Sequence, residues 1–265
     1  MPACLRGFVL VAAVGCAACA PKLMKLPTGT GTPAPDIRDA IVEATTACQV
    51  VRSLSAEIGV SGSVGKQGLR GRLLIGVASP DSARIEAVAP FGQPVFILVA
   101  KSGDATLLLP RDQRVLEHGK PAEVLEAVAG IPLDAMDLRR ALVGCGAALD
   151  GDAARAIGND WRVVPDGPDE AYLHRDARSG PWRIVAIVHK RKDGPAWRAE
   201  YKDFANGLPR SVRLAGPEFD LRLALSQVDL NVALGDEVFR VQVPRSADPI
   251  TLDELKRARP GVRKD

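Results

Sequence analysis

The sequence predicts a mainly β protein with helices (α+β), in which a curved antiparallel sheet, or half barrel, is covered by a lid of about three helices. Two observations predict this fold. Stretches that alternate apolar and polar residues follow one another across hairpin-length turns, and such strands pair antiparallel and present one apolar face. Other stretches repeat apolar residues every three or four positions, which is typical of amphipathic helices that could cover that face.

Residues 1–15 resemble a lipoprotein signal peptide. Arg6 supplies a positive charge, and the apolar run at 8–15 is too short to cross a bilayer. Small residues precede Cys16, as in a lipobox, so we expect Cys16 to be acylated, with Cys19 as the alternative. Several acyl chains on one residue would hold a protein permanently on a membrane. An ordinary cleaved signal peptide is the other possibility.

The residue after either cysteine is alanine. By analogy with lipoprotein sorting, this favours attachment to the outer membrane, on its periplasmic face. Residues 16–35 are rich in proline, glycine and threonine, which predicts a lipidated N-terminus followed by a flexible tether. Residues 36–244 have the length of one large domain. Residues 245–265 form an extension with a short helix at 252–259 and a basic end.

The domain begins with a helix at 36–54, which Asp36 could cap. One face of this helix carries Ile37, Ile41, Ala44, Cys48 and Val51. Strands are then expected at 56–64, 69–77, 83–100 (a hairpin), 105–109 and 114–117. Two further helices follow at 122–129 and 135–143, and Asp134 could cap the second.

Alternation returns after the third helix. Tryptophan and aliphatic residues mark one face of each strand in this second series, and Asn206 and Gly207 mark a turn between two of them. Strands are expected at 182–188, 197–201, 212–214, 219–225 and 238–243.

The turn inside the 83–100 hairpin carries a phenylalanine between two prolines. Pro90, Phe91 and Gly92 lie where loop residues are normally polar, and the prolines make the turn stiff. Phe91 therefore needs an apolar partner, either a membrane or another protein. The alternative is that Phe91 folds back and plugs the end of the sheet.

The apolar faces of the strands are aliphatic and poor in aromatic residues and charge. Such a surface suits an acyl chain as well as it suits a packed core. Some of the residues on these faces are expected to line a cavity, and others to pack outside the sheet. The candidates are Leu73, Ile75, Ile85, Phe96, Leu98, Leu108, Ile184, Leu221 and Leu223.

Cys48 lies in the first predicted helix and Cys145 follows the third, so both belong to elements of the predicted lid. An oxidising compartment would allow them to form a disulfide. Otherwise, both are small buried residues or part of a helix end.

We find no pattern typical of catalysis, metal binding or a cofactor. The three histidines, His118, His174 and His189, lie in separate contexts without ligand spacing, and we expect them on the surface. Asp166, Asp169 and Glu170 are interpreted as cap or loop acids rather than as a catalytic pair. The net charge of +3 is well mixed along the chain, which argues against a nucleic-acid partner. The sequence therefore predicts no enzyme.

The order of the motifs resembles the LolB family of outer-membrane lipoprotein receptors. The turn at 89–93 (APFGQ), the helix pair at 130–144 (GIPL…LRRALVG) and the strands at 197–201 and 219–223 are similar to motifs of that family. The resemblance covers residues 53–229.

This resemblance implies a half barrel with helices over its mouth. It also implies that the protein takes the acyl chains of lipoproteins from a LolA-like periplasmic carrier and helps to place them in the outer membrane. Phe91 stands where the family has a protruding leucine that helps membrane insertion. The alternative is a structural or assembly lipoprotein of the same fold that transfers no lipid.

Overall fold

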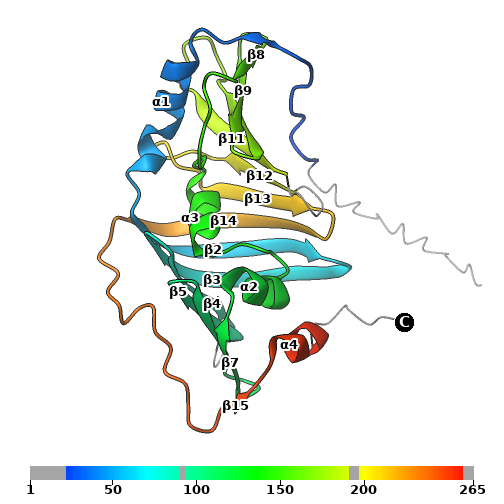
Figure 1. The fold of residues 1–265 in the computed structure, drawn as a ribbon, viewed down its shortest axis with the longest axis vertical. Helices are drawn as coiled ribbons and strands as arrows, with labels where there is room; N and C mark the ends of the chain where they lie inside the picture. Colours follow the sequence, from blue (N-terminus) through cyan, green and yellow to red (C-terminus); the bar gives the residue numbers. More distant parts are fainter. Residues whose placement is uncertain (1–21, 90–93, 191–196, 259–265) are drawn as a thin grey trace, which may run out of the picture.

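The computed structural model describes residues 22–89, 94–190 and 197–258 (Figure 1). The predicted acylation sites Cys16 and Cys19 lie outside the described residues, as does the turn with Pro90, Phe91 and Gly92. The described chain is mainly β, with four helices, and its strands form one open sheet of fifteen strands. Every pair of neighbouring strands is antiparallel except β7 and β15, and the order is β1-β8-β9-β10-β11-β12-β13-β14-β2-β3-β4-β5-β6-β7-β15.

The strands at the centre of the sheet are long. The β2–β3 hairpin joins Ser53–Val64 to Gln67–Ala78, and β14 (Phe219–Leu230) pairs with the other side of β2. On the β3 side lie β4 (Ser82–Val88), β5 (Phe96–Lys101), β6 (Asp104–Leu109), β7 (Arg114–Gly119) and β15 (Asp248–Pro249). On the β14 side lie β13 (Ser211–Gly216), β12 (Trp197–Lys202), β11 (Arg183–His189), β10 (Asp169–His174), β9 (Trp161–Asp166), β8 (Arg155–Ile157) and β1 (Thr32–Pro33).

The helices are α1 (Ile37–Gln49), α2 (Pro121–Ala129), α3 (Ala135–Val143) and α4 (Leu252–Ala258). Asp134 caps α3 by accepting a hydrogen bond from the Asp137 backbone N–H at 2.8 Å, as predicted. Gly130 and Gly144 end α2 and α3 in the left-handed conformation, which glycine adopts without steric cost. Asp36, by contrast, does not cap α1 with its side chain; its carboxylate binds Arg162 on β9 instead.

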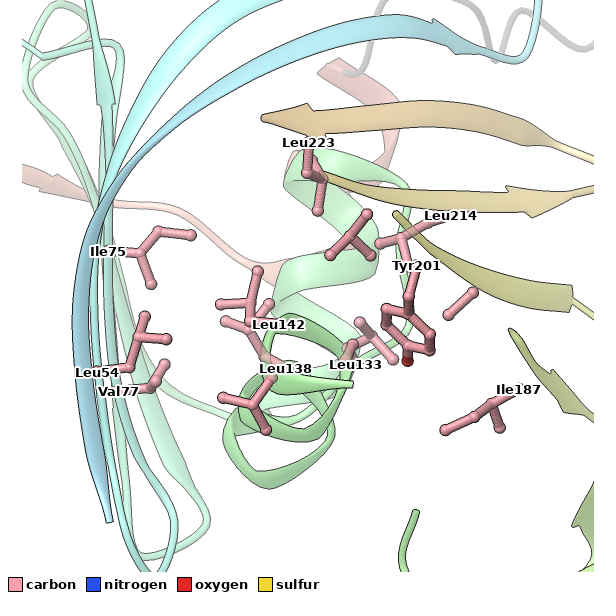
Figure 2. Packing of buried hydrophobic residues seen from close by; sticks show 14 of the residues in the cluster. Leu54, Ile75, Val77, Leu133, Leu138, Leu142, Ile187, Tyr201, Leu214 and Leu223 are labelled. Atoms are coloured by element: carbon pink, nitrogen blue, oxygen red, sulfur yellow. The ribbon is translucent and has the colours of Figure 1, made fainter. Parts of the chain in front are cut away.

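The main core lies between the sheet and the helices. Strand register aligns one aliphatic row across the β2–β7 half of the sheet. The row is Ala56, Ile75, Ile85, Leu98, Leu107 and Leu116, and all six are buried. Leucines of α3 and buried residues of α1 and α2 belong to the same cluster, so these helices cover this face of the sheet (Figures 1 and 2).

Leu108 does not belong to this row. It pairs with Ile97 and Val115, one residue out of phase with Leu107, and so it lies on the opposite face of the sheet. The sequence does not show which of the three consecutive leucines at 107–109 faces the main core, because all of them suit a strand that is buried on both faces. Residues 234–240 cross this opposite face. Arg84 donates hydrogen bonds to the carbonyl oxygens of Val238 at 3.1 Å and Arg240 at 2.9 Å.

The predicted strand at 238–243 is wrong, because these residues form a turn and an irregular segment. The chain then continues past the predicted end of the domain as part of the same fold. Strand β15 extends the sheet beside β7, and α4 contacts α2 and buries Leu255 in the main core. The last segment therefore passes from one face of the sheet, around its edge, to the helices on the other face (Figure 1).

The segment before α1 differs from the flexible tether that its composition predicts. The Met24 backbone N–H donates to the Glu200 carboxylate at 2.7 Å. Met24 and Leu26 pack on an outer cluster made of Val163, Tyr172, Val185 and Ala186. Thr32 and Pro33 form β1, which pairs with β8. A few apolar side chains among the prolines and glycines suffice to hold this segment on the sheet.

Candidate functional site

Helix α3 fills the space between two parts of the curved sheet. Figure 2 shows Leu138 and Leu142 between a wall formed by Leu54, Ile75 and Val77 and a second wall that includes Leu214 and Leu223. All of these side chains are buried and belong to one cluster. The interior at this level is therefore packed by the protein's own leucines.

Most of the predicted cavity residues are found in this packed interior. Ile75, Ile85, Leu98, Ile184, Leu221 and Leu223 are buried in the main core, and Leu73 and Phe96 pack partly buried against it. Leu108 is buried on the other face of the sheet, as described above. The structure thus brings most of the candidates together as a filled core rather than as the lining of an open cavity.

A pocket of about 240 Å³ lies beside the packed region, between α3 and strands β9–β12. Its apolar wall is formed by Leu133, Ala141, Ile187 and Trp197, and none of the predicted cavity residues lines it. The pocket is smaller than the several hundred cubic ångströms typical of sites for larger ligands. It has room for a small group or for the first part of a chain.

Charged side chains line the rest of the pocket. They come from α3, from the β9–β10 hairpin and from the end of β11. These residues are Asp137, Arg140, Asp166, Asp169, His189 and Lys190. Basic and acidic side chains both line the pocket, which is therefore polar without a single dominant charge.

His189 is fixed by two neighbours. Its Nδ1 lies 2.8 Å from the Asp169 carboxylate, and its ring stacks on Trp197 with centroids 3.8 Å apart. The Lys190 backbone N–H also donates to Asp169, at 2.9 Å. His189 is therefore part of an ordered wall and is not the isolated surface residue that the sequence suggests.

Asp166 is buried, with 4 % of the residue exposed. Its carboxylate accepts hydrogen bonds from the backbone N–H groups of Ala147 and Ala148, just after α3. Of the two expected roles, cap or loop acid, the loop is wrong, because Asp166 is the last residue of β9. Its side chain holds the end of the helical segment against this strand.

Asp137 and Arg140 face the pocket from α3, with Asp137 Oδ1 and Arg140 Nη1 3.9 Å apart. Burial raises the pKa of Asp137, and the negative charge of Asp134 adds to this effect, while Arg140 and His189 act against it. Tyr201 forms part of the inner wall. Burial, and to a lesser extent the charge of Asp166, raises the pKa of Tyr201, so its side chain stays a neutral hydroxyl at any physiological pH.

A disulfide closes this end of the helical layer. Cys48 at the end of α1 is joined to Cys145 after α3, with the two Cα atoms 5.6 Å apart. The bridge is one of the two alternatives that the sequence left open. Since Cys145 also lines the pocket, the disulfide fixes α3 where the packed interior and the pocket meet.

The strands that supply Asp166 and Asp169, β9 and β10, are not among the predicted elements. The two residues pair across the end of the β9–β10 hairpin, with Gly167 and Pro168 as its turn. Asp-Gly between two apolar runs is a strong hairpin signal, and it could have revealed these strands.

The pocket combines hydrogen-bonding groups with an apolar wall. In the part of the chain that the structure describes, no group of histidine, cysteine or carboxylate side chains could hold a metal ion. Within the same residues, no helix is both long and apolar enough to span a membrane.

No protein-family model matches the sequence, and no curated protein matches it. Several solved structures are similar at low identity. A LolA superfamily protein from Nitrosomonas europaea is 12% identical over 77% of this chain and 97% of its own, with a TM-score of 0.46. A putative outer membrane lipoprotein-sorting protein domain from Vibrio parahaemolyticus is 11% identical over 77% and 94%, with a TM-score of 0.46.

The lipoprotein LppX from Mycobacterium tuberculosis is 10% identical over 76% of this chain and 99% of its own, with a TM-score of 0.33. None of these three proteins bears the name LolB. These similarities therefore do not point specifically to the receptor family that the sequence motifs resemble.

Proposed function

We propose that the protein is an outer-membrane lipoprotein that binds the acyl chains of other lipoproteins and helps to place them in that membrane. In this proposal the curved sheet is a half barrel, and α1, α2 and α3 are its lid. The sequence motifs that resemble the LolB family support it. The proposal includes a LolA-like carrier as the donor, and it includes no catalysed reaction.

The observation that carries the proposal is the position of α3. This nine-residue helix places Leu138 and Leu142 between two aliphatic walls. An acyl chain offers the same kind of surface as these leucines. It could therefore replace them if α3 and the loop before it moved, at little cost in apolar contact. The packed state would then be the form without cargo.

The filled interior also supports a second candidate function, a structural or assembly lipoprotein without lipid transfer. In that case α3 is a permanent part of the core. The two functions predict different effects of a truncation in α3 on lipid binding. Only in the first function does a ligand compete with the α3 leucines for the same place.

The test compares Leu142→Ala with Leu107→Ala. Both leucines are almost fully buried, so each change should cost about 2–5 kcal/mol of unfolding free energy. Leu142 belongs to α3 and Leu107 to the sheet. Titration of delipidated protein with a synthetic N-acylated lipopeptide should show tighter binding for Leu142→Ala only, because fewer contacts then hold the lid closed.

Native mass spectrometry of the wild-type protein should also detect co-purified acyl species. If neither wild-type protein nor Leu142→Ala binds the lipopeptide, the structural function is the correct one. Tighter binding in both variants would show only that a destabilised core admits lipid.

Anchoring and delivery are tested separately. Cys16→Ala should release the protein from membranes and abolish palmitate labelling; labelling that persists would transfer the role to Cys19. Phe91→Glu should abolish delivery of lipoproteins while lipopeptide binding survives, because a carboxylate resists entry into hydrocarbon. A large fall in melting temperature for Phe91→Ala would instead place Phe91 in the core.

A further inference from the structure

Tyr201, which lines the pocket beside α3, carries a buried hydroxyl that the fold does not use. Tyr201 is 1 % exposed, and its Oη has no hydrogen-bond partner among the described residues. Figure 2 shows this oxygen at the end of the ring that points away from Leu214 and toward Leu133 and Ile187. Leu133, Ile187 and Tyr201 line the same pocket.

Such a hydroxyl is unusual, because buried polar groups nearly always have a partner. The only other tyrosine of the chain follows the rule: the Tyr172 hydroxyl lies on the outer cluster and donates to Glu170 Oε2 at 3.2 Å. A phenylalanine would fill the position of Tyr201 without leaving a polar atom unpaired. The hydroxyl therefore contributes nothing to packing that the ring alone does not.

The charges around the hydroxyl restrict what could pair with it. Asp166 lines the same pocket. Its buried carboxylate accepts hydrogen bonds from backbone N–H groups and has the capacity to accept further ones. Asp137 and Asp169 line the pocket farther along. The two cations of the pocket, Arg140 and Lys190, are paired with carboxylates, Asp137 at 3.9 Å and Glu170 at 3.2 Å. A carboxylate or phosphate placed next to Tyr201 would therefore be repelled by Asp166, whereas an uncharged donor would be attracted to it.

We propose that this pocket binds an uncharged group that both donates and accepts a hydrogen bond at the end of an alkyl chain, an acyl amide above all. In this arrangement, the amide oxygen accepts from Tyr201 Oη and the amide N–H donates to the Asp166 carboxylate. Leu133, Ile187 and Trp197 contact the first carbons of the chain. The proposal rests on the proposed function, in which an amide-linked acyl chain of a lipoprotein is the natural source of such a group.

The selectivity that follows is specific. Amide-linked chains are accepted at the pocket, while free fatty acids and anionic phospholipid head groups are rejected there. A receptor that meets many phospholipids for every lipoprotein needs a discrimination of this kind, and the aliphatic interior cannot supply it, because it contacts only methylene groups.

The test uses small probes with equal chains: hexanamide, hexan-1-ol and hexanoate. Binding is followed by NMR of protein labelled with ¹³C at tyrosine, which has two tyrosine side chains to resolve. Hexanamide should shift the Tyr201 signals and leave those of Tyr172 unchanged. Hexan-1-ol should bind more weakly at the same place, and hexanoate should not bind.

Tyr201→Phe should weaken hexanamide binding about tenfold, which is the effect of one lost hydrogen bond in a buried site. Its melting temperature should be unchanged or higher, because the variant removes an unpaired buried group. Tyr172→Phe is the matched control: the same atom is lost outside the pocket, and hexanamide binding should be unchanged. Equal binding of hexanoate, or equal effects of the two variants, would overturn the proposal. So would a pocket that binds none of the probes and holds only water.

The lipopeptide of the previous section separates this proposal from the proposed function. If wild-type protein and Tyr201→Phe bind it equally and hexanamide does not bind, the pocket proposal fails and the proposed function stands. If the lipopeptide does not bind but hexanamide binds through Tyr201, the proposed function fails and the pocket is a site for small amides.

Discussion

Helix α3 makes different contacts with the two halves of the sheet. In the β2–β7 half, an unbroken aliphatic row shares one core with Leu138 and Leu142 of α3, which contacts β3 and β4. In the β9–β12 half, carboxylates, His189 and Tyr201 face Asp137, Arg140 and Ala141 of that helix. The first contact is closely packed, and the second leaves a pocket.

The difference follows from helix geometry. Leu138 and Leu142 are four residues apart and lie on one face, whereas Asp137 and Arg140 lie on the adjacent face. A helix of this length can therefore complete a core on one side and present polar groups on the other. On the β2–β7 side, α3 makes aliphatic contacts, and on the β9–β12 side it lines a pocket with polar groups. The following changes test that division.

The largest effect is expected from the disulfide, which holds both contacts of α3 in place. Replacing Cys48 and Cys145 together by alanine should lower the free energy of unfolding by about 3–5 kcal/mol, because the bridge closes a long loop in the unfolded chain. Urea denaturation measures this loss. A reductant should produce a similar loss in wild-type protein and none in the double variant; a loss below about 1 kcal/mol would mean that the core alone positions α3.

Truncations on the two sides of α3 compare the halves directly. Leu107→Ala in the aliphatic row should cost near the upper end of about 2–5 kcal/mol. Ile187→Ala should fall near the lower end, because Ile187 lines a pocket and already lacks neighbours on one side. Chemical denaturation of both variants gives the comparison. Equal losses would show that the pocket side is packed as closely as the aliphatic side.

On the outer face, Glu200→Gln removes a buried charge. Glu200 is 2 % exposed, lies 2.6 Å from Arg198 Nη2 and accepts the Met24 N–H. The variant should lose about 1–3 kcal/mol, since Arg198 is left without its counter-charge. It should also be cut faster by trypsin at Lys25, whose segment is then held less firmly. Glu57→Gln, in the exposed pair with Arg72, should change stability by at most about 1 kcal/mol and leave cleavage unchanged.

The smallest effect concerns pH. The hydrogen bonds from Arg162 hold the pKa of Asp36 below its usual value. A lowered folded-state pKa stabilises the protein above the normal aspartate pKa of about 4, and this contribution is lost as the pH falls through the folded value. Asp36→Asn should therefore cost about 1 kcal/mol at pH 7, a figure reduced for solvent screening of this partly exposed pair. The cost should shrink below pH 4; a cost independent of pH would show that the charge is not what matters.

Much of this fold can be predicted from the sequence where local patterns are clear. Helix α3 is predicted to the residue, and α2 to one residue, because an N-terminal cap or proline and a C-terminal glycine mark their ends. The β2–β6 strands follow from alternation. The β9–β10 hairpin is marked only at its turn, because Arg162, Asp166 and Glu170 interrupt the apolar pattern of its strands. The partner of the buried Arg162 is Asp36, which lies 126 residues away in the chain.

Local sequence patterns predict little of the candidate site. Whether an aliphatic wall encloses a cavity or a core is decided by what stands in front of it, and here that is α3. The pocket residues come from α3, the β9–β10 hairpin, β11 and β12, and no local spacing relates them. The unpaired Tyr201 hydroxyl is visible only once the surrounding side chains are placed.

The two outermost strands have a consequence for the behaviour of this protein in solution. An open sheet offers unpaired N–H and C=O groups at each edge, which can recruit further strands and begin edge-to-edge aggregation. Here β1 and β15 are each two residues long, and each contains a proline, Pro33 or Pro249, which has no N–H to donate. Within the described residues, the sheet thus ends on both sides in strands too short and too poor in donors to template another copy.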